Sequence, residues 1–294
     1  SGHTLILGWS PKIFTILSEL SIANQNQHHP HIVILSETDK SEMEDQIKSL
    51  VPKLFNTKVI ARSGDPLENS DLDMVGFNSA RSIIVLPPEN DEMHDLFIIK
   101  VVLAIVNNPN RKKEKYHIVA EIHDEKTLEV LDLIGHEEIL VLQLSEVMAR
   151  LTVQVAHQPG LSIVIEDLLK FEGDEIYFSN IPILAGKTFA EAQIMFENSS
   201  VIGVQHPSGE TKLNPDMNYI LQSNDNIIAI SEDDDTVIPN GHPEKAQGLQ
   251  NISVEVINDR KPVRTIILGY NPRIKMILQE LANYFPDGSA ISIF

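Results

Sequence analysis

The chain has 294 residues, no cysteine and a formal net charge of −19, and 42% of its residues are hydrophobic. This length accommodates about two domains with a sizeable core. The lack of cysteine excludes disulfide bonds and thiolate metal sites, as is typical of a reducing compartment. The acidic balance argues against a nucleic-acid partner, because phosphates demand a basic surface.

Membrane spans are not predicted in these residues. The longest apolar candidate, 96–106, is only as long as a helix and ends at Asn107, well short of the roughly 18–20 apolar residues of a span. The first residues lead directly into a predicted strand and show no signal-peptide pattern. We therefore expect a soluble, intracellular chain.

The first half alternates Ile/Val/Leu-rich runs with helical patterns. Strands are predicted at 4–7, 31–35, 58–61, 82–86, 116–121 and 139–141. Helices are predicted at 11–24, 40–50, 67–75, 91–106 and 125–133. Near-continuous apolar strands are typical of a parallel sheet that helices cover on both faces. The alternation predicts an α/β, Rossmann-like, doubly wound parallel sheet.

The second half changes in texture. A crossover helix at 145–158 and a short helix at 161–170 precede a smaller α+β lobe. Strands are predicted there at 175–179, 200–206, 219–221 and 226–230, and a helix at 188–196. A segment with two prolines and two glycines, 236–250, is predicted to be a linker, followed by a strand at 253–256.

An internal repeat joins the two ends of the chain. The stretch that begins at Thr4 returns at Thr265, an offset of 265 − 4 = 261, and ten of the seventeen residues in 4–20 are identical. Each copy is predicted to form a strand, a glycine turn and a helix, the opening of a Rossmann-like domain. Because a two-strand fragment cannot close a core, we expect the chain to belong to a longer polypeptide.

Five segments follow from these patterns. We predict a Rossmann-like lobe at 1–144, crossover helices at 145–170, a small lobe at 171–235, a linker at 236–262 and the start of a second Rossmann-like domain at 263–294.

The first glycine turn is unusual for a dinucleotide site. Such a site needs several glycines so that backbone N–H groups approach the pyrophosphate. Here Gly8 is followed by Trp9, Ser10 and Pro11, so a bulky indole replaces a glycine and proline removes a donor. NAD binding is therefore not expected. Trp9 is open to two interpretations, packing at the turn or stacking on a ligand.

A ligand would bind at the crevice formed by the carboxyl ends of the first three strands. The candidate residues for a cofactor there are Gly8, Trp9, Ser10, Glu37, Asp39, Ser63, Gly64 and Asp65. The alternative is that the polar members only cap helices, as Asp and Ser commonly do.

No catalytic motif is present: the sequence has no G-x-S-x-G elbow, no Walker loop and no zinc-protease helix motif. We therefore do not expect an enzyme. The cluster His28-His29-Pro30-His31 is a weak metal candidate, because no suitably spaced partner lies near it in the sequence.

Acidic residues offer hard oxygen ligands for calcium. The first candidate group follows the crossover region and comprises Glu166, Asp167, Glu172, Asp174 and Glu175. A second acidic run spans 232–235, although four consecutive acids cannot all point at one ion. The alternative for both groups is a solvated charged surface.

Several stretches together resemble the cytosolic region of the Castor/Pollux ion channel family, which is built from RCK (regulator of K⁺ conductance) domains. They run through nearly the whole chain in the order of that family: Gly2–Ser10, Arg62–Pro66, Ala80–Leu86, Gln158–Leu161 with Glu166–Asp167, Leu213–Asp216 and Ile230–Thr236. The Trp after the first glycine is typical of this family.

The resemblance implies a gating-ring module of a cation channel, regulated by Ca²⁺ or another small ligand. It implies a homotetramer, a transmembrane pore portion outside this chain, and a place on the cytosolic face of a membrane. That membrane would be the cell membrane in a bacterium or the nuclear envelope in a plant. Calcium-gated RCK domains carry carboxylates just after the crossover region, which favours Glu172 and Asp174.

Two alternatives stay open at this stage. One is a TrkA-like nucleotide-responsive peripheral subunit of a potassium uptake system, which the glycine-poor turn at Gly8 disfavours. The other is a dehydrogenase with a degenerate cofactor loop, for which no acid–base pair is recognisable beside the crevice.

Overall fold

The computed structural model describes residues 2–88, 93–240 and 261–294. The chain divides into two compact units, Ser1–His157 with Val263–Phe294, and Gln158–Pro262. No helix within the described ranges is long and apolar enough to cross a membrane. The predicted strand at 253–256 and most of the predicted linker lie outside the described residues.

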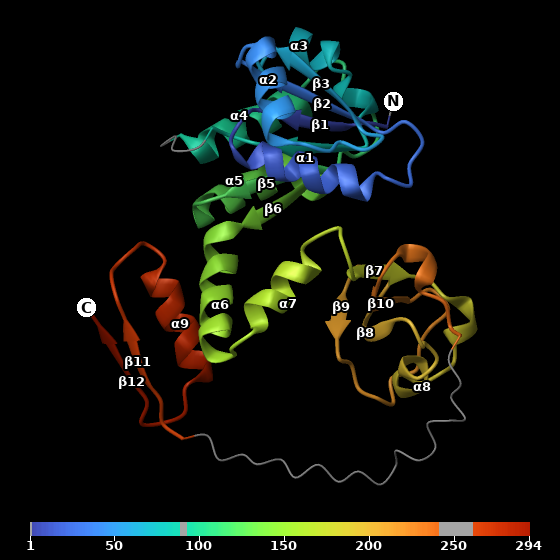
Figure 1. The fold of residues 1–294 in the computed structure, drawn as a ribbon, viewed down its shortest axis with the longest axis vertical. Coiled ribbons are helices and arrows are strands. Elements are labelled where there is room, and N and C mark those ends of the chain that lie inside the picture. The colour runs from blue at the N-terminus through green and yellow to red at the C-terminus, as the bar shows by residue number, and fades with distance from the viewer. Residues whose placement is uncertain (1, 89–92, 241–260) are drawn as a thin grey trace. The chain divides into compact units, whose positions relative to one another are not determined.

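The first unit contains a six-stranded sheet of order β3-β2-β1-β4-β5-β6 in which every strand pairs parallel to its neighbours (Figure 1). Its strands are β1 (Thr4–Leu7), β2 (His31–Ser36), β3 (Lys58–Ser63), β4 (Ser82–Val85), β5 (Ile118–Ile122) and β6 (Ile139–Gln143). Its connecting helices are α1 (Lys12–Ala23), α2 (Lys40–Leu50), α3 (Asn69–Met74), α4 (His94–Val106) and α5 (Glu125–Gly135). The predicted doubly wound fold is confirmed.

Two apolar cores form because successive side chains of a strand point to opposite faces of the sheet. Leu5 and Leu7 of β1 belong to one core with residues of α3, α4 and α5. Ile6, between them, belongs to the other core with Ile13 and Leu17 of α1. All three β1 side chains are fully buried. The change of strand order between β1 and β4 leaves a crevice at their carboxyl ends, where ligands of such sheets bind.

The second copy of the repeat reproduces the first in detail. It consists of β11 (Arg264–Ile267), α9 (Ile274–Tyr284) and β12 (Ala290–Ile293), and β11 pairs parallel with β12. The Gly269 N–H donates to the Phe294 carbonyl at 2.7 Å, as the Gly8 N–H donates to Leu35 at 2.8 Å. Both glycines have positive φ, 93° and 105°. The sequence repeat is therefore also a repeat of backbone geometry.

Helix α6 (Leu144–His157) packs against α9. Ala149 and Val153 are the buried residues of α6, and Ile274 and Leu281 are those of α9. These apolar positions attach the second copy of the repeat to the rest of the first unit.

The second unit is an α+β lobe with a four-stranded antiparallel sheet of order β7-β10-β8-β9. Its strands are β7 (Glu175–Ser179), β8 (Ser200–Gln205), β9 (Thr211–Leu213) and β10 (Asn226–Ser231), and its helices are α7 (Leu161–Leu168) and α8 (Phe189–Gln193). Among the described residues the two units also contain four short 3₁₀ segments: η1 (Phe77–Ser79), η2 (His136–Glu138), η3 (Pro182–Leu184) and η4 (Asp234–Thr236).

One predicted strand of this lobe is wrong. Residues 219–221 form only an isolated bridge between Ile220 and Thr188. Instead, β9 (Thr211–Leu213) forms the edge strand beside β8 and pairs with it across the Pro207–Glu210 turn. Pairing across a short turn requires little chain closure, so the local hairpin forms although its three residues are all exposed.

Candidate ligand-binding crevice

Gly8 is required by the close approach of two strands. Its φ is 105°, and a Cβ at this position would lie 2.0 Å from the Leu86 carbonyl oxygen. Only glycine tolerates both the left-handed backbone and the contact. The turn therefore serves the packing of β1 beside β4, and the two residues that follow Gly8 are also turned inward.

Trp9 packs edge to face on Phe14, with 5.7 Å between ring centroids, and joins the α1 core. This contact favours packing over ligand stacking. Ser10 is only 2% exposed, and its Oγ has no hydrogen-bond partner among the described residues. The first turn thus offers a ligand little accessible surface.

The other predicted cofactor residues are engaged with the backbone. Asp39 caps α2 by accepting from the N–H groups of Ser41 and Glu42. Ser63 Oγ donates to the Thr38 carbonyl at 2.9 Å. Further hydrogen bonds of this edge are Gly64 N–H to Ser36 O, Leu67 N–H to the Asp65 carboxylate, and Asp65 N–H to the Asp71 carboxylate. Glu37 is exposed. These residues line one edge of the sheet as expected, but their use as ligands stays a prediction.

A cavity of about 190 Å³ lies on the other side of the switch point, at the carboxyl ends of β4 and β5. Its described lining consists of Lys12, Val85, Leu86, Pro87, His94, Glu121 and His123, and so includes none of the eight predicted cofactor residues. Across it, Lys12 Nζ contacts both carboxylate oxygens of Glu121, at 2.9 and 2.8 Å. A ligand entering here must compete with this ion pair.

The wall of this cavity is built around Asp95. One carboxylate oxygen accepts from His94 Nδ1 and the His123 N–H, both at 3.0 Å. The other accepts from the Asp124 N–H at 2.9 Å and Thr127 Oγ1 at 2.7 Å. Burial raises the pKa of the Asp95 carboxyl, but these hydrogen bonds outweigh burial and hold it below its usual value. Asp95 is therefore an anion at neutral pH.

Two imidazoles are stacked on this support. The rings of His94 and His123 lie 3.9 Å apart with an interplanar angle of 15°, and His94 is buried whereas His123 is exposed. One ligand atom each of His94, Asp95 and His123 lies within 4.8 Å of the others, within the reach of one metal ion. Both Asp95 oxygens already accept two hydrogen bonds, however, which fills the capacity of a carboxylate. Asp95 is better suited to orienting the two rings than to binding an ion.

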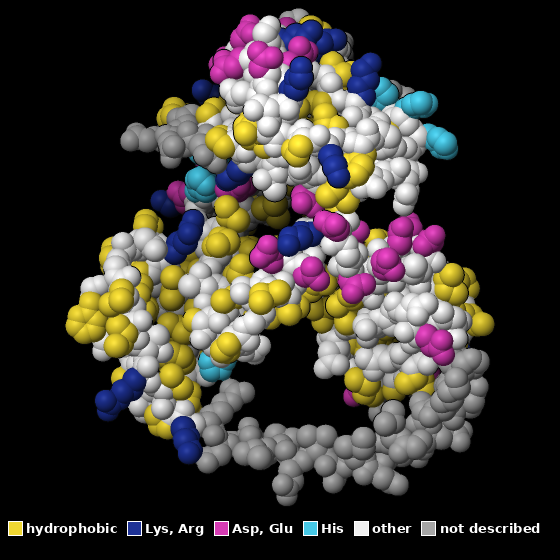
Figure 2. All heavy atoms as spheres, in the orientation of Figure 1, with side chains coloured by type: hydrophobic (Ala, Val, Ile, Leu, Met, Phe, Trp, Pro, Cys, Tyr) yellow, Lys and Arg dark blue, Asp and Glu magenta, His cyan; other side chains and the backbone are white. Residues whose placement is uncertain are grey.

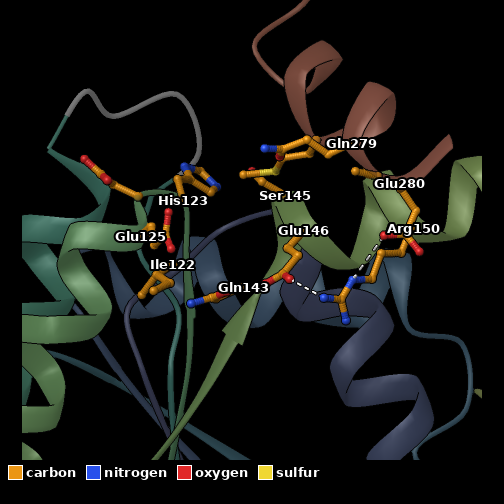
Figure 3. Close-up of a pocket in the computed structure, with 12 residues that line it drawn as sticks. Ile122, His123, Glu125, Gln143, Ser145, Glu146, Arg150, Gln279 and Glu280 are labelled. Atoms are coloured by element: carbon orange, nitrogen blue, oxygen red, sulfur yellow. Dashed lines mark hydrogen bonds and ion pairs between the residues drawn. The ribbon is translucent and has the colours of Figure 1, made fainter. Parts of the chain in front are cut away.

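A second cavity of this unit, of about 230 Å³, lies between the end of the sheet and α9 (Figure 3). Arg150 of α6 donates to Glu146 at 2.6 Å and lies 4.0 Å from Glu280 of α9. His123 lines this cavity as well as the crevice. The crevice wall is thus continuous with the contact between α6 and α9.

The predicted calcium ligands lie in the second unit. Glu166 and Asp167 are exposed on α7, where Glu166 pairs with Lys170 at 3.1 Å. Glu172 and Asp174 are exposed in the following turn, and Glu175 begins β7. Within the described residues these five are not brought together as a group with ligand atoms inside 4.8 Å.

The second acidic run does gather. Asp233, Asp234 and Asp235 present carboxylate oxygens within 4.8 Å of one another. The pairing of Ser231 with Glu175 brings this run toward the start of β7. Burial raises the pKa of the Tyr177 hydroxyl, and Glu175, Asp233 and Asp234 raise it further.

Comparison with known proteins decides the family. Residues 145–247 match the family model described as Castor and Pollux, part of voltage-gated ion channel, and residues 1–125 match the calcium-activated potassium channel slowpoke-like RCK domain. The probable ion channels POLLUX of Arabidopsis thaliana and Oryza sativa are 40% and 36% identical to the chain over its full length. The chain belongs to the Castor/Pollux family.

This Castor/Pollux chain spans 35% and 30% of the lengths of those two relatives. Its fold is that of RCK gating-ring domains: the human SLO3 gating ring superposes with a TM-score of 0.65 at 16% identity, covering 99% of this chain and 59% of that one. The relatives named here are described as probable ion channels, which favours the channel interpretation over a TrkA-like subunit or a dehydrogenase.

The sequence analysis missed Lys12, Glu121, His94 and His123 as crevice residues. Two of them could have been predicted, because Glu121 and His123 lie at the carboxyl end of the fifth predicted strand. The rule that ligands bind at the carboxyl ends of parallel strands applies there too. His94 gave no such signal, because it lies on a helix and reaches His123 only through the tertiary fold.

Proposed function

We propose that this chain is the ligand-sensing regulatory module of a Castor/Pollux cation channel, in which Ca²⁺ or another small ligand biases pore opening. The observation that carries the proposal is the match of the whole chain to 30% and 35% of the lengths of two probable ion channels of plants. The slowpoke-like family matched by residues 1–125 is described as calcium-activated, which supports calcium as the ligand. In this proposal the chain has no catalytic role.

The proposed assembly is a homotetrameric ring at the cytosolic face of a membrane, attached to a pore portion outside these residues. The fold similarity to a gating ring supports this arrangement. A ligand shifts a conformational equilibrium only by its difference in affinity between the two states, typically about 1–3 kcal/mol per site. Four equivalent sites multiply that difference into a decisive bias.

The proposed calcium site uses carboxylates of the second unit. Glu166, Asp167, Glu172, Asp174 and Glu175 are the predicted ligands. The run Asp233–Asp235, which follows the β10 residue paired with Glu175, would supply additional oxygens. Calcium takes six to eight oxygens, so a site assembled from both groups satisfies its chemistry better than either group alone.

The test is the double substitution Glu172→Gln with Asp174→Asn in the full-length channel, recorded across a series of Ca²⁺ concentrations. We expect the half-activating concentration to rise at least about 5-fold, the lower end of typical coupling. The charge-matched control is Glu129→Gln with Asp132→Asn, two exposed positions on α5. An unchanged calcium response in the first variant would refute this site.

Binding to the isolated chain can be measured by thermal unfolding with Ca²⁺, Mg²⁺, NADH or ATP at matched ionic strength. A ligand at 100 times its dissociation constant stabilises the fold by about 2.7 kcal/mol. We expect a shift with Ca²⁺ and a smaller one or none with Mg²⁺. A shift with the nucleotides alone would favour the TrkA-like alternative and direct attention to Lys12 and Glu121 in the crevice.

A further inference from the structure

A cavity lined by four histidines lies at the amino ends of β1 and β2, whereas the crevice lies at the carboxyl ends of the strands. Its volume is about 310 Å³, and its lining includes His3, His28, His29 and His31. Histidine side chains gather on this edge of the surface (Figure 2). The last three form the sequence cluster that lacked a spaced partner, and the fold supplies His3 as that partner.

His3 carries an unexplained buried nitrogen. The residue is 8% exposed, and its Nε2 has no hydrogen-bond partner among the described residues. Buried polar atoms are nearly always paired, and an unpaired one carries a free-energy cost. A ligand that accepts the Nε2 lone pair would remove this cost.

His31 is held beside His3 by strand register. Thr4 pairs with Ile32 in the parallel β1–β2 ladder, so the preceding residues, His3 and His31, are also neighbours. Side chains in register on adjacent parallel strands point to the same face of the sheet. The two imidazoles are therefore positioned on one side of the cavity.

The hydrogen bond of His31 defines which nitrogen is available. Its Nδ1 lies 2.6 Å from the His29 carbonyl oxygen. A carbonyl oxygen only accepts, so Nδ1 carries the proton and Nε2 of the neutral ring keeps its lone pair. Donation of the second ring N–H to a carbonyl is the usual arrangement of a metal-binding histidine.

We propose that this cavity binds a transition-metal ion of the Zn²⁺ class through Nε2 of His3 and His31, with a third imidazole from His28 or His29. Imidazole ligands suit Zn²⁺, whereas Ca²⁺ and Mg²⁺ take oxygen. In the described residues no three of these histidines have donor atoms within 4.8 Å of one another. Because His28 and His29 are exposed, rotation of their side chains completes the site.

The experiment is calorimetric titration of the untagged 294-residue chain with Zn²⁺. We compare the wild type with His31→Gln and with two controls, His117→Gln, an exposed histidine outside the cavity, and His123→Gln in the crevice. We expect His31→Gln to weaken binding at least about 10-fold, the lower end of the effect of disturbing a metal site. His117→Gln should bind as the wild type does. Ca²⁺ at the same concentration should not bind at this site.

Two outcomes overturn the proposal: unchanged binding in His31→Gln, or weakening in His123→Gln alone, which would place the ion beside His94. If His31→Gln does not fold, ring ¹⁵N spectra of the wild type decide the question. Zn²⁺ must then move the Nε2 resonances of His3 and His31, and spectra in which only other histidines respond reject the site.

Discussion

Asp95 connects several of the segments that form the wall of the crevice. It accepts hydrogen bonds from two backbone N–H groups, one hydroxyl and one imidazole. These donors come from α4, from the turn after β5 and from α5, so a single carboxylate ties three segments together. The same hydrogen bonds hold the pKa of the Asp95 carboxyl below its usual value.

Substitution of Asp95→Asn should destabilise the first unit in a pH-dependent way. The amide introduces donors toward existing donors, so we expect a loss of about 1–3 kcal/mol in the free energy of unfolding at pH 7. A depressed folded pKa contributes stability above the unfolded value of about 3.9 and loses it as pH falls through the folded pKa. The difference between wild type and variant should therefore shrink below about pH 4.

Urea unfolding at a series of pH values measures this difference. The control is Asp132→Asn, an exposed carboxylate on α5, which should stay within about 0.5 kcal/mol of the wild type. A difference for Asp95→Asn that does not change with pH would contradict the role assigned to its charge.

At the scale of elements, the start of α2 decides between two interpretations of Asp39. Its carboxylate accepts from Ser41 N–H at 2.8 Å and Glu42 N–H at 3.2 Å. These are backbone donors that the first turn of a helix leaves without a partner. The geometry accounts for Asp39 without any ligand, whereas Glu37 has no comparable role in the helix.

Asp39→Ala should lower the free energy of unfolding by about 1 kcal/mol, the usual cost of losing an N-cap. Glu37→Ala, two residues earlier and exposed, serves as the control and should change it by less than about 0.5 kcal/mol. Chemical denaturation of both variants provides the measurement. Equal stability of the two variants would mean that the cap contributes nothing and would restore Asp39 as a ligand candidate.

At the scale of the whole molecule, the repeat determines how the first unit is assembled. The second copy contributes only two strands and a helix, and its strands expose large apolar side chains such as Ile266 and Ile293. Its attachment depends on α9 packing against α6, where Ile274 and Leu281 are buried. The link between the second copy and α6 is therefore concentrated in a few side chains.

Leu281→Ala should loosen this attachment. Loss of a buried leucine typically costs about 2–5 kcal/mol, and the cost should appear locally. Amide hydrogen exchange in 264–293 should accelerate while β1 and β4 stay protected. Leu268→Ala, at a position 81% exposed, is the matched control and should leave exchange unchanged. Equal acceleration in 264–293 and in β1 and β4 would indicate global rather than local unfolding.

The sequence by itself determined the parallel sheet and the repeat, because both are local patterns. Apolar runs such as 4–7 and 31–35 are typical of strands buried between helices. The repeat is found by comparing the residues around Gly8 with those around Gly269. The strand predicted at 219–221 was wrong, because an apolar pattern occurs both in strands and in buried turns. The available pairing partners decide whether such a segment becomes a strand.

Only the tertiary structure decided which polar groups meet. His94 and His123 stack because α4 and the end of β5 lie side by side, and His3 joins His31 because β1 pairs with β2 in one register. Neither meeting follows from spacing along the chain, since the contacts are set by strand order and helix packing. Long-range packing therefore brings together residues that are far apart in the sequence.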